Sequence, residues 1–243
     1  DVYRNRSELV FDVKGNGILP RPDLRKKANG DMMHWEKENI FENDDIKVVI
    51  PANALYETLN FKYKSAEAPK DAFSKLYHIH NEYTPLHKNI NISLRIEDLP
   101  KTLSEKAFVA QIKKNNNGKE EKIIFCGGET EGDFITTQTR SFGKYTVLVD
   151  TIAPIIKPVI YNGTIIHPNN QLKFLITDEL SGIQSFNGFI DNEWALFEYD
   201  AKNDLLFYSI NEERLEKNKE HELELFVIDN KGNIATYYST FNW

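Results

Sequence analysis

The chain has a single cysteine, no long apolar run and fewer basic than acidic residues, and each shortage excludes a class of protein. Cys126 alone can form neither an internal disulfide nor a thiolate zinc cluster. No apolar run approaches the ~18 residues of a membrane span, so none is expected. A net charge of −7 argues against nucleic acid as a partner, because its phosphates need a basic stripe.

Apolar and polar residues alternate along most of the chain, whereas helical periodicity is almost absent. We expect strands at 8–13, 46–50, 90–96, 107–113, 121–125, 143–149, 173–177, 185–190, 194–199, 205–209, 222–228 and 234–241. Short helices are expected only at 69–74 and 212–218, and a single turn is the alternative for the second. Turn-forming asparagine, aspartate and glycine separate the strands. Short strands at this spacing predict an all-β fold, with antiparallel immunoglobulin-like β-sandwiches in tandem.

The clearest domain boundary is the segment Asp150-Thr151-Ile152-Ala153-Pro154, which is followed by Pro158. Proline removes a ladder donor and restricts the residue before it, so two prolines close together indicate a strand exit and an extended linker. We therefore expect one sandwich at 44–150 and a second at 151–243.

A weak internal repeat relates residues 229–241 to residues 1–13, since each opens on Asp, three residues and Asn before an alternating stretch. The sequence Asp-x-x-Gly-Asn suits a hairpin corner, in which Asp accepts turn amide hydrogens and Gly or Asn takes a positive φ. The repeat predicts that 1–43 is the last strand of a preceding module plus a linker. It also predicts that Asp1 is not the native start.

The second half resembles bacterial immunoglobulin-like modules that open with Asp-Thr-x-x-Pro, here at Asp150, and close with Asp-x-x-Gly-Asn, here at Asp229. The segments 177–183, 190–194 and 220–223 extend this resemblance to the C-terminal region of Bacteroidetes lysostaphin-type zinc metallopeptidases. In those cell-wall endopeptidases, similar modules follow the peptidoglycan-cleaving domain.

The first half is similar to the same region at residues 48–56, 77–81, 85–88 and 140–145, and residues 48–56 also resemble the β-domain of ankyrins and netrin receptors. The resemblance covers most of 44–243 and implies non-catalytic modules whose parent protein is a zinc metallopeptidase. It further implies a periplasmic or extracellular location at the cell surface. The expected partner is a cell-wall component or the protein's own peptidase domain.

His78 and His80 form a His-x-His pair, and His87 follows seven residues later. Residues i and i+2 of a strand share a face, so the pair could bind zinc with His87 as a third ligand. The peptidase family also uses a His-x-His pair, with an earlier histidine closely followed by aspartate. Here His34 departs from that pattern, since Asp44 is far off. An ordinary strand face with satisfied imidazoles is the alternative, and no cofactor is expected.

No nucleophile stands out, since Cys126 in Phe-Cys-Gly-Gly indicates a small residue before a turn and no Gly-x-Ser-x-Gly elbow exists. No catalytic residue is therefore assigned. Asp178 and Asp229 fall near expected loops and are candidates for calcium, although aspartate also caps turns without an ion.

Three tryptophans are candidates for ligand binding, because flat rings can stack on sugar faces: Trp35, Trp194 and Trp243. Trp194 alternates with Leu196 in an expected strand, which favours a core position instead. The leading hypothesis is a non-catalytic structural and interaction region of a cell-envelope protein. A carbohydrate- or peptidoglycan-binding module is the first alternative, and a hydrolase using His78 and His80 is the second.

Overall fold

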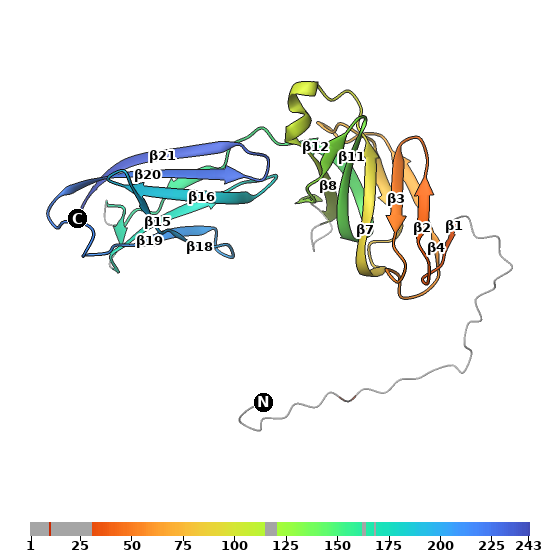
Figure 1. Ribbon diagram of the computed structural model, residues 1–243, viewed down its shortest axis with the longest axis horizontal. Helices are drawn as coiled ribbons and strands as arrows, with labels where there is room; N and C mark the ends of the chain where they lie inside the picture. The colour runs from red at the N-terminus through yellow and green to blue at the C-terminus, as the bar shows by residue number, and fades with distance from the viewer. Residues whose placement is uncertain (1–9, 11–30, 115–120, 162–163, 168) are drawn as a thin grey trace.

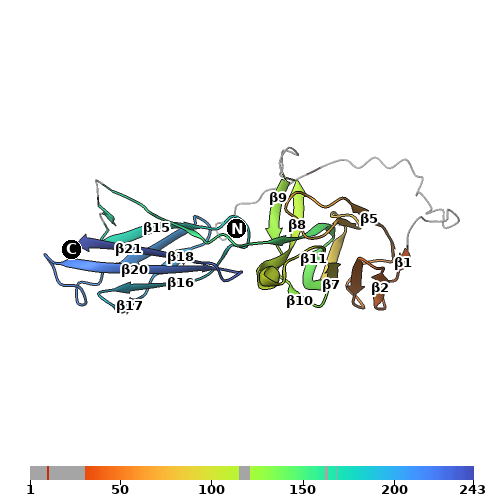
Figure 2. The same ribbon diagram turned by 90° about the horizontal axis from the view of Figure 1, so that it is seen from above.

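The computed structural model describes Val10 and residues 31–114, 121–161, 164–167 and 169–243. The predicted strand 8–13, the repeat at 1–13 and most of the segment 1–43 lie outside the described residues. The rest of the chain forms two antiparallel β-sandwiches placed end to end (Figures 1 and 2), as the sequence predicts. Within the described part, no helix is long and apolar enough to cross a bilayer.

The first sandwich consists of two five-stranded sheets and a two-stranded ribbon. The first sheet, called the β7 sheet, has the order β10 (Glu129–Glu131), β11 (Phe134–Ser141), β7 (Pro85–Arg95), β3 (Ile46–Ile50) and β2 (Asn39–Glu42). The second, the β12 sheet, has the order β5 (Tyr63–Ala66), β6 (Leu76–Ile79), β12 (Gly143–Val149), β8 (Ala107–Lys114) and β9 (Glu121–Phe125). The ribbon pairs β1 (Asp31–Met33) with β4 (Leu59–Phe61), and a 3₁₀ helix spans Lys101–Lys106.

The second sandwich also has two sheets. The β15 sheet has the order β13 (Ile155–Pro158), β15 (Gln171–Thr177), β19 (Leu205–Ser209) and β18 (Glu198–Asp200), and β14 (Ile166–His167) also pairs with β15. The β20 sheet has the order β17 (Glu193–Ala195), β16 (Ile183–Ile190), β20 (Glu220–Asp229) and β21 (Ile234–Asn242). All pairings are antiparallel, so each sandwich buries the inner faces of two antiparallel sheets.

Period-2 alternation decides which side chains enter the cores. In β3, Ile46, Val48 and Ile50 are fully buried, and they share one apolar cluster with Tyr145 and Val147 of β12. A second cluster fills the other sandwich between the β15 and β20 sheets. Burying one such side chain contributes about 1.5–3 kcal/mol, so these alternating strands supply most of the driving force for each sandwich.

Four predicted strands have the predicted bounds, namely β3, β9, β12 and β19. The predicted strand 194–199 is wrong, because the chain there leaves the β20 sheet after β17 and enters the β15 sheet at β18. Ala195 and Phe197 stay buried through this crossover while Leu196 stays exposed. The alternation therefore continues across two sheets and hides the break between them.

The predicted helix at 69–74 is wrong, and the segment 212–218 forms only a short turn, closed by the N–H of Leu215 on the Asn211 carbonyl at 3.0 Å, which is the shorter alternative that the sequence allows. Residues 69–74 and 212–218 form turns, and Asp71 and Asn218 within them have φ values of 63° and 58°, which no right-handed helix accommodates. The first sandwich also begins before residue 44, because β2 pairs with β3 and β1 pairs with β4.

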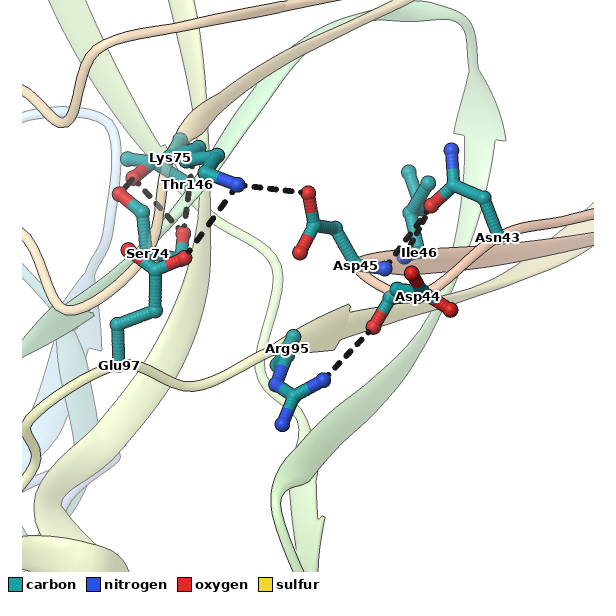
Figure 3. Close-up of polar contacts among 9 residues, drawn as sticks. All are labelled: Asn43, Asp44, Asp45, Ile46, Ser74, Lys75, Arg95, Glu97 and Thr146. Carbon is teal, nitrogen blue, oxygen red and sulfur yellow. Dashed lines mark hydrogen bonds and ion pairs between the residues drawn. The ribbon is translucent and has the colours of Figure 1, made fainter.

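Polar contacts gather at one end of the first sandwich, where Ser74 bonds to β12 of its own sheet and Lys75 reaches Asp45 beside β3 of the other sheet (Figure 3). Ser74 Oγ accepts the N–H of Val147 at 2.9 Å and lies 3.2 Å from Thr146 Oγ1. Next to it, Lys75 Nζ donates to Asp45 Oδ2 at 2.8 Å, and this hydrogen bond raises the pKa of Lys75. Ser74 is buried and Lys75 is partly exposed, so the hydrogen bond of Ser74 contributes more to stability than the ion pair of Lys75.

Replacing Ser74 with alanine (Ser74→Ala) should lower the free energy of unfolding by about 1–3 kcal/mol, because the buried N–H of Val147 loses its acceptor. Chemical denaturation of the variant measures the loss. The exposed Ser65→Ala on β5 is the matched control and should stay within about 0.5 kcal/mol of wild type. Equal effects of the two substitutions would contradict this assignment.

Candidate functional site

The junction between the sandwiches is built around Asp150, which is fully buried. Its N–H donates to the Lys106 carbonyl at 3.0 Å, and its carbonyl accepts from Asn233 Nδ2 at 3.0 Å. Its carboxylate accepts the N–H of Ile152 at 3.1 Å and the N–H of Ser181 at 3.2 Å. Because Lys106 belongs to the first sandwich and Asn233 and Ser181 to the second, one residue makes hydrogen bonds to both.

Two further contacts cross the junction. Lys106 Nζ donates to the Lys231 carbonyl at 2.7 Å. Leu180 of the second sandwich packs against an apolar cluster on the outer face of the β12 sheet, which includes Phe108 and Leu148. Burial and the nearby charge of Lys106 lower the pKa of Lys231. Polar and apolar contacts thus act together at the junction.

The corner at Asp229 has the predicted geometry. Asp229 Oδ1 accepts the N–H of Lys231 at 2.7 Å and of Asn233 at 2.8 Å, and Gly232 has a φ of 72°. A side chain at Gly232 would be strained in this left-handed conformation. The Asp-x-x-Gly-Asn sequence is therefore a tight turn between β20 and β21, and its Asn233 is placed to reach Asp150.

Asp150, Asp178 and Asp229 each place a carboxylate oxygen within 4.8 Å of the others. Among the residues described, they are the only group of three or more His, Cys, Asp or Glu residues this close. The sequence predicts Asp178 and Asp229 for calcium but misses Asp150. Carboxylates are ligands that Ca²⁺ prefers. Asp178 also caps a turn, since its Oδ1 accepts the N–H groups of Ser181 and Gly182, so the calcium prediction stays a prediction.

The three candidate histidines are not brought together. His78 lies on β6 opposite Lys64 and Lys144. Burial and the charges of these two lysines lower the pKa of His78, and the same charges would repel a cation. His80 follows the end of β6 with a φ of 50°, so the pair does not share a strand face. His87 is exposed, and its Nδ1 lies 3.4 Å from the Tyr56 hydroxyl.

The ring of His80 packs against the core, 5.9 Å from the Phe61 ring centroid and 5.0 Å from that of Phe142. It lines a cavity of about 340 Å³ together with Asn60 and Tyr56. Within the described residues, His80 Nδ1 and Asn60 Oδ1 are buried without a hydrogen-bond partner. Burial lowers the pKa of His80, which favours the neutral form of the ring.

The tryptophans occupy three different environments. Trp35 is exposed in the turn after β1. Trp243 packs against the second core, with Lys217 Nζ 5.8 Å from its ring centroid. Trp194 is 54% exposed, so its predicted core position is wrong, since Ala195 is the residue of β17 that faces inward.

Trp194 begins a row of side chains that crosses the outer face of the β20 sheet. The strand registers place it beside Phe189, then Glu224, then Tyr238 on β21. Phe226 extends the apolar surface, with its ring 6.1 Å from that of Phe189. A hydrogen bond with Glu224 raises the pKa of Tyr238. Sequence reasoning misses this row because it depends on the registers of four strands.

Cys126 has the predicted context, next to Gly127 and Gly128, both with positive φ. Its thiol lies 3.6 Å from the Ile124 carbonyl, and burial raises its pKa. A thiol of raised pKa is a poor nucleophile at neutral pH. This is the environment of a packed side chain.

His221 lies at the end of the second sandwich away from the junction and is 4% exposed. Its Nδ1 lies 2.6 Å from Asp191 Oδ2, and its Nε2 lies 2.9 Å from the Glu216 carbonyl. A neutral imidazole carries one N–H, so two acceptors require the charged form. Burial lowers the pKa of His221, but its hydrogen bonds and the charges of Asp191 and Glu216 outweigh that effect and raise it.

The fold and its junction define a tandem β-sandwich protein. In a comparison with protein families, residues 30–150 match the Zu5-like domain. The matched segment starts just before β1 and ends at Asp150, so it corresponds to the first sandwich. No curated protein matches the chain. The resemblance to peptidase-associated modules has no counterpart in these comparisons and stays a prediction.

The stability of the second sandwich should depend on the charge of His221. The pKa of His221 is raised above 6.5, so the His221–Asp191 pair contributes fully to stability below pH 6.5. This contribution is lost as pH rises through the raised pKa of His221. Burial raises the pKa of Asp191, but its hydrogen bonds outweigh this effect and lower the pKa below 3.8. The contribution of the pair is therefore also lost as pH falls through the lowered pKa of Asp191.

A hydrogen bond to a charged group contributes about 1.5–3 kcal/mol, and the exposure of Asp191 places the expected loss at the lower end. Denaturation between pH 5 and pH 9 should show this loss in wild type but not in His221→Gln. The exposed His34→Gln serves as the control and should keep the wild-type profile. An unchanged profile in His221→Gln would show that another group titrates.

Proposed function

We propose that the chain is a non-catalytic structural and interaction region of a secreted or periplasmic cell-envelope protein, which holds two sandwiches in a fixed relation and presents their faces to a partner. The observation that carries this proposal is the junction, where every polar group of Asp150 has a partner. A buried carboxylate tolerates little displacement of its donors, since each lost hydrogen bond leaves an uncompensated charge.

The cell-envelope setting is supported by the sequence of the second half, from Asp150 to the corner at Asp229. On that resemblance, the region serves a lysostaphin-type peptidase by positioning the catalytic domain or by docking on the cell wall. The Zu5-like match concerns the first sandwich alone and leaves this setting open.

Small-angle X-ray scattering of the whole chain tests the fixed relation. We expect the wild-type curve to fit a single arrangement of the sandwiches. The double variant Lys106→Met and Asn233→Ala removes two side-chain hydrogen bonds across the junction and should require a range of arrangements. Asn203→Ala, which removes a hydrogen bond to Asp200 in an exposed turn, is the control. A wild-type curve that itself requires many arrangements would refute the proposal.

Carbohydrate binding is a second candidate function, favoured by the aromatic row on the β20 sheet. Trp194 and Tyr238 are 54% and 67% exposed at its two ends. Neighbouring strands lie about 4.8 Å apart, so the row spans about 14 Å, a length suited to several sugar rings. Between the aromatic rings, Glu224 offers a carboxylate for sugar hydroxyls.

Titration with a soluble N-acetylglucosamine oligomer, followed by tryptophan fluorescence or calorimetry, tests this function. Trp194→Ala should weaken binding by about tenfold, equivalent to about 1.4 kcal/mol. Trp35→Ala removes an exposed tryptophan from the other sandwich and should leave binding unchanged. If the two variants bind alike, or wild type does not bind, the aromatic row is not a sugar site.

A further inference from the structure

The outermost strands of the four large sheets differ in charge. Each of the eight has one hydrogen-bonded neighbour along its sheet order. Seven of them, all except β21, contain at least one charged residue, represented by Glu42, Lys64, Lys122, Glu129, Lys157, Glu193 and Glu198. Charged residues on edge strands oppose pairing with other chains. β21 is the exception and is also the longest of the eight, with nine residues.

β21 reads Ile-Ala-Thr-Tyr-Tyr-Ser-Thr-Phe-Asn and contains neither proline nor glycine. Its isoleucine, threonines, tyrosines and phenylalanine are residue types that favour strands, and all nine residues pair with β20 on one side. In the described part of the chain, β21 pairs with no other strand; β13 approaches it but pairs with β15. Figure 1 shows β21 along the outer margin of the second sandwich. Its far side therefore offers backbone donors and acceptors to an added strand.

The composition of β21 favours a second copy of itself as that strand. The chain carries a net charge of −7, so copies repel one another over most of the surface, and an uncharged strand is where they approach at least cost. Antiparallel pairing of β21 with itself brings tyrosine and threonine opposite one another or opposite small residues. Aromatic and Thr–Thr cross-strand pairs stabilise sheets. Pairing would also cover Tyr237 and Ser239, which are half-buried at the sandwich margin.

We propose that β21 pairs antiparallel with β21 of a second copy of this chain, which joins two β20 sheets into one eight-stranded sheet across a two-fold axis. Such an interface is isologous, so each copy contributes the same surface. The two aromatic rows then lie on one continuous face. This inference goes beyond the proposed function and depends neither on the cell-envelope setting nor on sugar binding.

Sedimentation equilibrium of the whole chain over a wide concentration range tests the pairing. Wild type should form dimers, and the double variant Thr236→Lys and Thr240→Lys should weaken dimerisation at least about tenfold, because it places like charges across the axis. Asn187→Lys is the control: it adds a charge to the same face of the β20 sheet on the central strand β16, and should still dimerise. Circular dichroism establishes that each variant is folded.

Two further measurements do not depend on the lysine variants. Hydrogen exchange of wild type should show amides of β21 becoming more protected as concentration rises. In a Cys126→Ala background, single cysteines at 236, 238 and 240 should cross-link sharply at one position, because only residues facing themselves across the axis come within disulfide reach.

A chain that stays monomeric into the millimolar range overturns the proposal and leaves a strand of a different protein as the occupant of β21. Dimers that Asn187→Lys disrupts as strongly as the double variant also overturn it, since they would use the sheet face rather than its edge. A uniform cross-linking profile would likewise exclude a two-fold pairing.

Discussion

The contacts between the two sandwiches are centred on one buried residue, Asp150, whose carboxylate and main chain both make hydrogen bonds there. A charge removed from water must be met by hydrogen bonds, and here the donors are the backbone N–H groups of Ile152 and Ser181. Its main chain is bonded to Lys106 on one side and Asn233 on the other. Together with the Lys106–Lys231 hydrogen bond and the packing of Leu180, these bonds hold loops of the second sandwich against the first.

The two neighbouring carboxylates also accept hydrogen bonds from backbone N–H groups. Asp178 and Asp229 each accept backbone N–H groups of the turn that follows them, and Asn233 links the corner at Asp229 to Asp150. Three carboxylates this close repel one another, so the turn amides have a stabilising role beyond shaping the loops. Local turn chemistry and domain arrangement are coupled through the same atoms.

The sequence predicts the parts of the fold that follow from local pattern. β3, β9, β12 and β19 consist mainly of apolar and aromatic residues and lie where expected. β11 escapes prediction because Thr137 and Thr139 face inward, where they donate to the Cys126 carbonyl and contact the Tyr145 hydroxyl. Buried threonines look like surface residues in a sequence, and only the tertiary structure supplies their partners.

The candidate sites also divide into features with a local cause and features that depend on the tertiary structure. The turn at Asp229 is predictable because its cause is local, whereas the proximity of Asp150 and Asp178 depends on how two loops meet. Trp194 was expected inside because its neighbours alternate, but the phase of that alternation is set by Ala195 and Gly188, which pair on the inner face. The His-x-His pattern failed for a backbone reason, since the strand ends before His80.

The most direct test of the fixed junction is the measurement of residual dipolar couplings for backbone amides in both sandwiches of the intact chain. If Asp150 fixes their relation, couplings from the two sandwiches fit one alignment tensor of a single magnitude. Two tensors of clearly different magnitude would mean that the sandwiches reorient independently, and would contradict the account.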